Sequence, residues 1–262
     1  HLAILERALV DGITCYAVFE DDAVLCDAFT ERLQTYLAAL PDDAQWVYLG
    51  GQLLHAECCP PQPVNDQVYR PFNVHRTHAY ILRGRTVMER VYQHLCEVPW
   101  APRHHVDHRM GLLHEWDEVR VYVPARWLVA QADGPSDVAG RTTDLRWWRH
   151  PEELAGPAPP VVAVIGPYRS GTSCVAEVLH RLGVPMGLDA ATMSRPTPHA
   201  PRGTWEAPRL ARLCRQAVQE PHIVRMWPPE RVRRELRRLV VDRAHVMPGR
   251  PIGLKHPLLC MM

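Results

Sequence analysis

The pattern of apolar and polar positions changes period between residues 161 and 183. Val161 to Ile165 is a short β-branched apolar run, typical of a strand covered on both faces of a parallel sheet. Gly166 ends the run, and after a polar segment apolar residues recur at helical spacing up to Gly183, which stands where a left-handed C-cap is expected. The pattern predicts a strand, a loop and an amphipathic helix in succession. The apolar helix positions are Val175, Val178, Leu179 and Leu182.

The beginning of the chain predicts a second set of elements. An apolar stripe at helical spacing ends at Gly12, and Ile13 to Phe19 is strand-like. Further helices are indicated over Pro208 to Val218 and Pro229 to Val241. Strands and helices therefore occur in both halves, which predicts an α/β fold. The stripe consists of Leu2, Leu5, Leu9 and Val10.

Composition predicts two domains joined by a linker. Residues 132–160 are rich in Pro, Gly and polar side chains, and Ala155 to Pro160 is incompatible with regular helix or sheet. We expect one domain over residues 1–131 and another over residues 161–262. The chain of 262 residues is long enough to bury a core in each.

Charge and cysteine content narrow the function classes. The formal net charge of +1 gives no general attraction to nucleic acid. The 8 cysteines include the adjacent Cys58 and Cys59 and form a poor disulfide framework, so reduced thiols are expected. No apolar run approaches the roughly 20 residues that a membrane helix needs. We therefore expect a cytoplasmic chain with neither a membrane span nor a nucleic-acid partner.

The loop after residue 165 carries the residues of a phosphate site. Glycines let the backbone approach an anion closely, and the amides and dipole of a helix N-terminus favour negative charge. The spacing approaches that of the nucleotide triphosphatase loop, but Thr172 stands where that loop has Lys, which weakens an ATPase or kinase interpretation. An ordinary glycine-rich turn is the alternative. The candidate residues are Gly166, Arg169, Ser170, Gly171, Thr172 and Ser173.

With its cation at Arg169, the segment Arg-Ser-Gly-Thr-Ser at residues 169–173 resembles the 5′-phosphosulfate loop of sulfotransferases. The donor in that family is 3′-phosphoadenosine 5′-phosphosulfate (PAPS). The resemblance implies a P-loop sulfotransferase-like domain with a parallel sheet. It also implies that Arg169 steadies the bridging oxygen as sulfate leaves, that residues 170–173 bind the 5′-phosphate, and that no divalent metal takes part.

Two later segments extend this resemblance. Residues 202–206, Arg-Gly-Thr-Trp-Glu, are similar to a segment of bacterial carbohydrate sulfotransferases, which makes Glu206 the candidate base. The alternative is that Glu206 only favours the dipole of the following helix. Residues 252–257 resemble the family's second central strand, in which Lys255 would hold the acceptor or the sulfate. The alternative is that Lys255 and His256 are only surface residues. In that family, the elements that bind the 3′-phosphate follow this strand. We therefore expect the sulfotransferase-like module to be truncated.

Three carboxylates, Glu20, Asp21 and Asp22, directly follow the predicted strand 13–19, which we expect to be buried. Charges of the same sign at this spacing repel, and a divalent cation would neutralise them. The arrangement resembles the acidic signature of GT-A glycosyltransferases, in which Mn²⁺ or Mg²⁺ bridges carboxylates to the diphosphate of a sugar nucleotide such as a UDP-sugar. In that frame Glu20 and Asp22 take the outer positions.

Four segments lie in order along the first half, at residues 1–8, 19–23, 46–50 and 77–83. Together they resemble glycosyltransferase family 25, the lipopolysaccharide-type and procollagen galactosyltransferases. The resemblance implies a partial GT-A-like domain, and makes Asp107 a catalytic base or a further metal contact. His104, His105, Asp107 and His108 also look like a metal cluster, but adjacent histidines rarely converge on one ion, which favours a solvated loop. In this family a nucleotide-binding strand precedes the histidine that corresponds to His1. We therefore expect the chain to be an internal fragment of a longer polypeptide.

Two functions fit these patterns. The first is a bifunctional transferase that moves a glycosyl group from a sugar nucleotide and a sulfuryl group from PAPS to a glycan. The second is a non-catalytic nucleotide-binding or glycan-binding scaffold with degenerate domains. The predicted helix 229–241 adds a basic face, either simply solvated or a surface for an anionic glycan. Its arginines are Arg231, Arg233, Arg234, Arg237 and Arg238.

Overall fold

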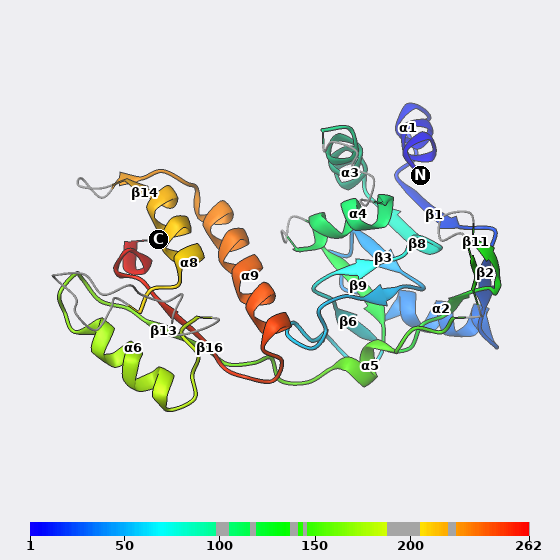
Figure 1. The fold of residues 1–262 in the computed structure, drawn as a ribbon. Coiled ribbons are helices and arrows are strands. Elements are labelled where there is room, and N and C mark those ends of the chain that lie inside the picture. The colour runs from blue at the N-terminus through cyan, green and yellow to red at the C-terminus, as the bar shows by residue number, and fades with distance from the viewer. Residues whose placement is uncertain are drawn as a thin grey trace. The chain divides into compact units, whose positions relative to one another are not determined.

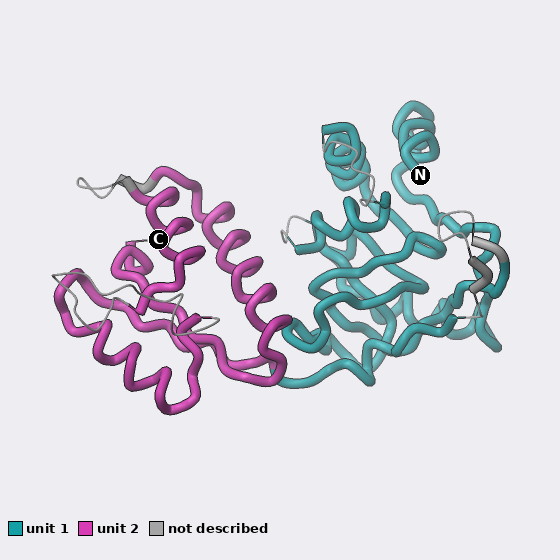
Figure 2. The backbone as a smooth tube through the Cα atoms, viewed as in Figure 1, with its two compact units in different colours: residues 1–157 teal, residues 158–262 magenta. Residues whose placement is uncertain are grey.

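The computed structural model describes residues 1–97, 105–115, 119–136, 141–143, 146–187, 205–219 and 224–261. The chain is a mixed α/β protein, as the sequence predicts, and it divides into two compact units, residues 1–157 and 158–262 (Figure 1, Figure 2). No helix in the described ranges has both the length and the apolar character needed to cross a bilayer. Of the residues singled out above, His104 and 202–204 lie outside the described ranges.

The first unit is built on a six-stranded sheet of order β1-β8-β3-β9-β6-β5. The central strand β3 pairs antiparallel with β8 and parallel with β9, which makes the sheet mixed. The elements are α1 (Leu2–Val10), β1 (Cys15–Phe19), β2 (Ala23–Leu25), α2 (Phe29–Ala38), β3 (Trp46–Tyr48), β4 (Gln52–Leu53), β5 (Gln62–Pro63), β6 (Val68–Arg70), β7 (Val74–His75), β8 (Ala79–Arg83), α3 (Arg85–Glu97), α4 (Val106–Glu115), β9 (Val121–Pro124), β10 (Val129–Gln131), β11 (Gly134–Ser136), β12 (Arg141–Thr143) and α5 (Pro151–Leu154).

Each face of this sheet packs against its own hydrophobic core. Side chains alternate between the faces of a strand, so Trp46 and Tyr48 enter one core while Val47 enters the other. The first core is completed by α1, α3 and α4, and the second by α2. Burial of one such large side chain contributes about 1.5–3 kcal/mol. Both cores therefore depend on the fully buried strand β3.

The strand before the acidic triplet differs from the expectation. β1 covers Cys15–Phe19, and only Val18 in it is buried. The reason is its place at the edge of the sheet, where it has β8 as its single neighbour and alternate side chains face outward. The prediction of a strand was right, and the prediction that it is buried was wrong.

The segment predicted as a linker is largely part of the first unit, which ends at Pro157. β11 pairs antiparallel with β12, and Trp148 packs against the first core. Trp127 binds the same segment, because its backbone N–H donates to His150 Nδ1 at 3.0 Å and its indole N–H to the Arg149 carbonyl at 3.0 Å. Residues 155–160 form no regular structure, as predicted.

The second unit contains a parallel strand pair. β13 (Val161–Val164) pairs with β16 (Ile252–Lys255), with Val164 opposite Lys255. Because the strands are parallel, their carboxyl ends lie at one edge. Gly183 has φ 93°, the left-handed conformation expected after the helix. The other elements are α6 (Thr172–Arg181), α8 (Pro208–Ala217), β14 (Val218–Gln219), β15 (Val224–Arg225), α9 (Pro229–Val246) and a 3₁₀ helix η1 (Pro257–Met261).

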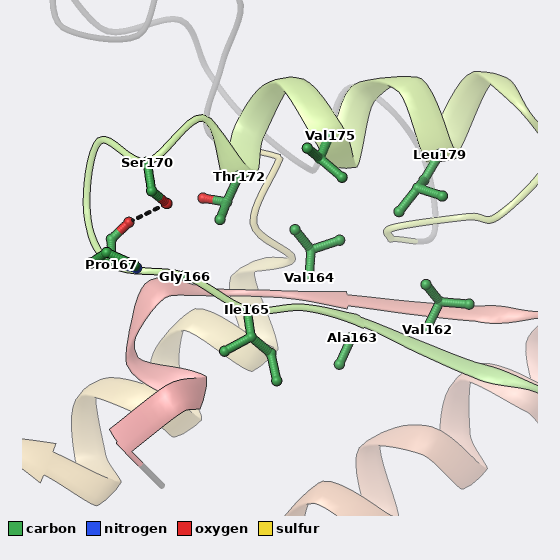
Figure 3. Close-up of a pocket in the computed structure, with 10 residues that line it drawn as sticks. All are labelled: Val162, Ala163, Val164, Ile165, Gly166, Pro167, Ser170, Thr172, Val175 and Leu179. Atoms are coloured by element: carbon green, nitrogen blue, oxygen red, sulfur yellow. Dashed lines mark hydrogen bonds between the residues drawn. The ribbon is translucent and has the colours of Figure 1, made fainter.

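The expectation that β13 is covered on both faces was wrong. Val161 is 48% exposed and Ile165 58%. Within the described part of the chain β13 pairs on one side only, and α6 leaves Val175 and Val178 exposed as well. Between β13 and α6 lies an open groove of about 510 Å³, into which Val164 points from the strand and Leu179 from the helix (Figure 3).

Gly50→Ala tests the packing of the first unit. A Cβ at Gly50 would overlap His78 Nε2 and the Val129 carbonyl oxygen, and neither can move freely inside the core. We expect a loss of about 1–3 kcal/mol in the free energy of unfolding, measured by chemical denaturation. Gly156→Ala is the control, because a Cβ there meets no atom within 4 Å; equal stability of the two variants would contradict the packing.

Candidate functional sites

The loop between β13 and α6 closes tightly around Gly166. A Cβ at this position would lie 2.7 Å from Ser170 Oγ and 2.8 Å from Thr172 Cγ2, so a larger residue would force the loop open. Gly171, the N-cap of α6, has φ 83°. The Ser170 hydroxyl donates to the Pro167 carbonyl at 2.7 Å (Figure 3). Both glycines thus serve the backbone path that a phosphate loop requires.

Arg169 is presented at the outside of this loop. Its backbone has φ 64°, an uncommon left-handed conformation for a residue with a side chain. The side chain is exposed and forms no salt bridge within the described ranges. An exposed guanidinium on a tight loop can turn toward an anion without first breaking an ion pair.

Three of the residues singled out in the sequence meet beside the loop. Lys255 Nζ donates to Glu206 Oε1 at 2.7 Å and to Ser173 Oγ at 3.2 Å. The Lys255 side chain is 2% exposed and the Glu206 side chain 17%. A buried ammonium is stable only with a counter-ion and hydrogen-bond acceptors, and these two side chains supply them.

Local packing places these side chains. Ser173 lies in the first turn of α6, and Lys255 ends β16. Glu206 follows Trp205, which packs against a small core. The buried residues of this core are Val164, Ala176 and Met186. The cluster therefore combines the carboxyl end of a strand, the start of a helix and the segment that leads into α8.

His256 completes the cluster. The backbone N–H of Leu258 donates to His256 Nδ1 at 3.2 Å, which places the imidazole proton on Nε2. That nitrogen lies 3.6 Å from Glu206 Oε2, so both oxygens of the carboxylate face a nitrogen donor. The alternative that Lys255 and His256 are surface residues is wrong, because both are buried.

The acidic triplet is spread over three environments. Glu20 Oε1 accepts from Thr77 Oγ1 at 2.6 Å and from His1 Nε2 at 2.9 Å, while Asp21 is exposed. Asp22 Oδ2 accepts from Gln131 Nε2 at 2.8 Å. The Asp22 Oδ1 atom is buried and has no hydrogen-bond partner among the residues that the structure describes. A bound cation would satisfy this oxygen.

One polar segment, residues 75–78, joins the triplet to Asp107. Thr77 binds Glu20, and the backbone N–H of Arg76, at φ 78°, donates to Asp107 Oδ2 at 3.2 Å. His78 is fully buried below them, and its burial lowers its pKa. The sequence identified Thr77 and His78 only through the family resemblance and missed Arg76, because a positive φ leaves no periodic signal.

The histidines near Asp107 form a different group from the predicted one. His75, Asp107 and His108 offer ligand atoms that all lie within 4.8 Å of one another. His75 comes from β7, a separate element, and its ring centroid lies 4.4 Å from that of His108. The acidic triplet is not among the groups with this spacing in the described residues.

Burial keeps the histidines of this region neutral. Desolvation lowers the pKa of His75 to about 4 and that of His114 to about 3. The backbone N–H of Val74 donates to His114 Nδ1 at 3.3 Å, so His114 Nε2 carries the proton and lies 3.5 Å from the Tyr48 hydroxyl. Protonation of either ring would place a charge inside the unit.

Comparison with known proteins leaves the family open. No protein-family model, curated protein or solved structure matches this chain. The function of the chain must therefore be inferred from its residues and their geometry.

A double-mutant cycle tests the buried ion pair. Glu206→Leu removes the carboxylate from buried Lys255 and is expected to cost about 3–5 kcal/mol of unfolding free energy, whereas adding Lys255→Met restores a large part of it. Chemical denaturation measures both. Glu177→Gln, which breaks the pair with the exposed Arg181, is the control and should cost at most about 0.5 kcal/mol. Additive losses from Glu206 and Lys255 would mean that the pair is not coupled.

The pH dependence of stability tests the neutral state of His114. Its folded pKa of about 3 lies below the ordinary 6.5, so the unfolded chain binds the proton first as pH falls. The contribution of neutral His114 to the free energy of unfolding is complete above pH 6.5. As the pH falls toward 3, it is lost by about 1.4 kcal/mol per pH unit. His114→Gln should flatten the slope by that amount in denaturation curves between about pH 6 and about pH 4, while the exposed His105→Gln should not. Equal slopes would refute a neutral His114.

Proposed function

We propose that this chain is a carbohydrate-modifying transferase with two nucleotide sites. The second unit would transfer a sulfuryl group from PAPS to a glycan hydroxyl, and the first would transfer a glycosyl group from a sugar nucleotide. The observation that carries the proposal is the meeting of Ser173, Glu206 and Lys255 at the carboxyl ends of two parallel strands. Ligands of parallel α/β sheets bind at this edge.

The loop and the start of α6 fit an adenosine phosphosulfate donor in three respects. Its closure over Gly166 brings the backbone into a tight curve at the start of α6, where amides and dipole favour an anion. Ser173 Oγ accepts from Lys255 in the first turn of α6, and there the Ser173 hydroxyl would contact a phosphate oxygen of the donor. Arg169 would stabilise the charge that develops on the leaving phosphate oxygen.

Glu206 would act as the base of the sulfuryl transfer. The acceptor oxygen forms a bond to sulfur, the bond from sulfur to the 5′-phosphate oxygen breaks, and the hydroxyl proton passes to the carboxylate. Lys255 binds one oxygen of this carboxylate, and His256 Nε2 lies 3.6 Å from the other. Adenosine 3′,5′-bisphosphate leaves with the electron pair of the broken bond.

The first unit fits a divalent cation such as Mn²⁺ or Mg²⁺ at Asp22, because Asp22 Oδ1 is a buried carboxylate oxygen without a partner in the described ranges. Glu20, fixed by His1 and Thr77, would contribute beside it. The cation would neutralise the diphosphate of a UDP-sugar. Asp107 takes the role that the resemblance implies, a base or a further metal contact.

In the second unit, the exposed arginines of α9 offer a surface for an anionic glycan acceptor. They are Arg231, Arg233, Arg237 and Arg238.

A non-catalytic scaffold that binds nucleotides or glycans is the second candidate. It is favoured by the ion pair of Glu206 with Lys255, because this contact gives the carboxylate a structural role as the counter-ion of a buried ammonium. Release of adenosine 3′,5′-bisphosphate from PAPS in the presence of glycans separates the two functions. A transferase loses this release in Glu206→Gln, whereas a scaffold never shows it.

Calorimetric titration tests both nucleotide sites on one chain. We expect Arg169→Ala to weaken binding of adenosine 3′,5′-bisphosphate at least about tenfold, because a charge-assisted hydrogen bond is lost. Asp22→Ala should remove binding of UDP with Mn²⁺ and leave the bisphosphate affinity unchanged. The exposed residues Arg181 and Asp27, each replaced by Ala, are the matched controls. Loss of both ligands in either variant, or binding of neither by the unmodified chain, would contradict two sites.

A further inference from the structure

We propose that His75, Asp107 and His108 bind one transition-metal dication, best matched by Zn²⁺, at the junction of β7 and α4. Their ligand atoms lie within 4.8 Å of one another, a spacing that small side-chain rotations can close onto one ion. Two imidazoles and one carboxylate are ligands that Zn²⁺ accepts, and three protein ligands leave a position for water. No member of the acidic triplet is a ligand of this site. The site shares Asp107 with the proposed glycosyl transfer, but the binding of the ion does not require that activity.

The residues around the site hold its ligands in place. Asp107 Oδ1 accepts from the backbone N–H of His108 at 2.8 Å, and Asp107 Oδ2 from that of Arg76 at 3.2 Å. Such backbone donors fix a ligating carboxylate, and each oxygen keeps a lone pair for the metal. His75 is buried, so the surrounding side chains restrict its ring.

Gly111 allows this approach of α4. A Cβ there would lie 2.5 Å from Asn73 Oδ1 and 3.1 Å from His75 Nε2, so any other residue would push the helix away from β7. Asn73 Oδ1 is itself buried without a hydrogen-bond partner in the described ranges. The site therefore contains an additional oxygen acceptor next to His75.

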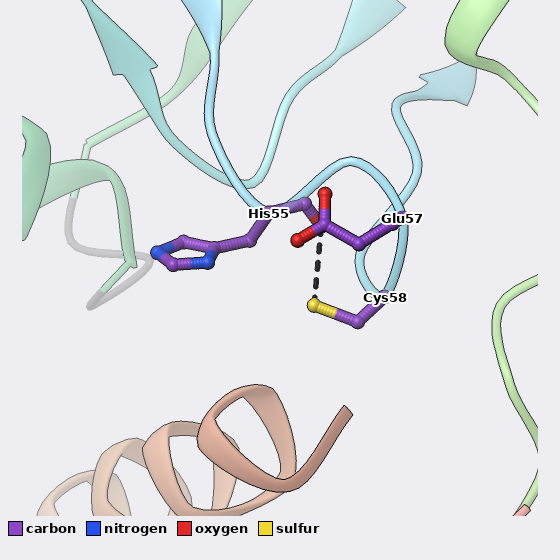
Figure 4. A group of neighbouring side chains, drawn as sticks. All are labelled: His55, Glu57 and Cys58. Carbon is purple, nitrogen blue, oxygen red and sulfur yellow. Dashed lines mark hydrogen bonds between the residues drawn. The ribbon is translucent and has the colours of Figure 1, made fainter. Parts of the chain in front are cut away.

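The other group with ligand spacing is less suited to a metal. His55, Glu57 and Cys58 lie on one short turn (Figure 4). The Cys58 thiol donates to the His55 carbonyl at 3.2 Å, and burial raises the pKa of this thiol. A metal needs the thiolate, which this environment disfavours. His75, Asp107 and His108 instead come from two elements whose relative position a metal would fix.

Charges near the site do not prevent binding. Arg76 and His55 both face His75. The Arg76 guanidinium lies over the Trp148 ring, 4.8 Å from its centroid, which holds part of its charge against an aromatic face. Asp107, itself one of the ligands, supplies a negative charge beside His75.

Titration of chelator-treated protein with Zn²⁺ and with Co²⁺ tests the site. We expect one tight equivalent by calorimetry and, with Co²⁺, visible absorption bands typical of low coordination number. His108→Ala and Asp107→Asn should each weaken this binding by at least about tenfold. Each variant's circular dichroism spectrum without metal should match that of the unmodified chain.

Three controls make the outcome decisive. His105→Ala, in the same histidine-rich run, and His55→Ala, in the other group, should leave the tight equivalent unchanged. Asp22→Ala should also leave it unchanged while removing UDP and Mn²⁺ binding, so failure of the metal site and failure of the nucleotide site are distinguishable. The proposal is overturned if the unmodified chain binds no Zn²⁺ tightly, if His108→Ala binds it as well, or if His105→Ala loses it equally.

Discussion

The burial of one ammonium group organises the second unit. Lys255 lies at the end of β16 opposite Val164, the last residue of β13 before the loop. Its charge is removed from water, so it must be compensated, and Glu206 and Ser173 do so over 2.7 Å and 3.2 Å. Three segments far apart in the sequence are thereby held at the edge where a parallel sheet binds its ligand. The contact thus joins the end of β16, the start of α6 and the segment before α8.

The first unit follows the same principle with a different contact. In residues 75–78, the Thr77 hydroxyl donates to Glu20 and the backbone N–H of Arg76 donates to Asp107. One short polar segment therefore fixes two acidic side chains. The fully buried His78 and the absence of a side chain at Gly50 allow this segment to lie close to the sheet. Carboxylates fixed in this way are preorganised for a cation or a cationic ligand.

Local features were predictable from the sequence, and long-range ones were not. The change from a β-branched run to helical spacing predicted β13 and α6, and Gly183 adopts the expected left-handed conformation. Periodicity does not say how many neighbours a strand has, so the exposure of β1 and β13 was missed. The contact of Glu206 with Lys255 spans 49 positions, and His75 joins Asp107 from another element. Such pairings depend on packing, which no local pattern contains.

A crystal structure of this chain with adenosine 3′,5′-bisphosphate tests the central claim most directly. The account predicts the 5′-phosphate at the start of α6, within hydrogen-bond distance of the Ser173 hydroxyl, with Lys255 still buried against Glu206. A phosphate bound elsewhere on the second unit, or a Lys255 side chain turned into solvent, would contradict it.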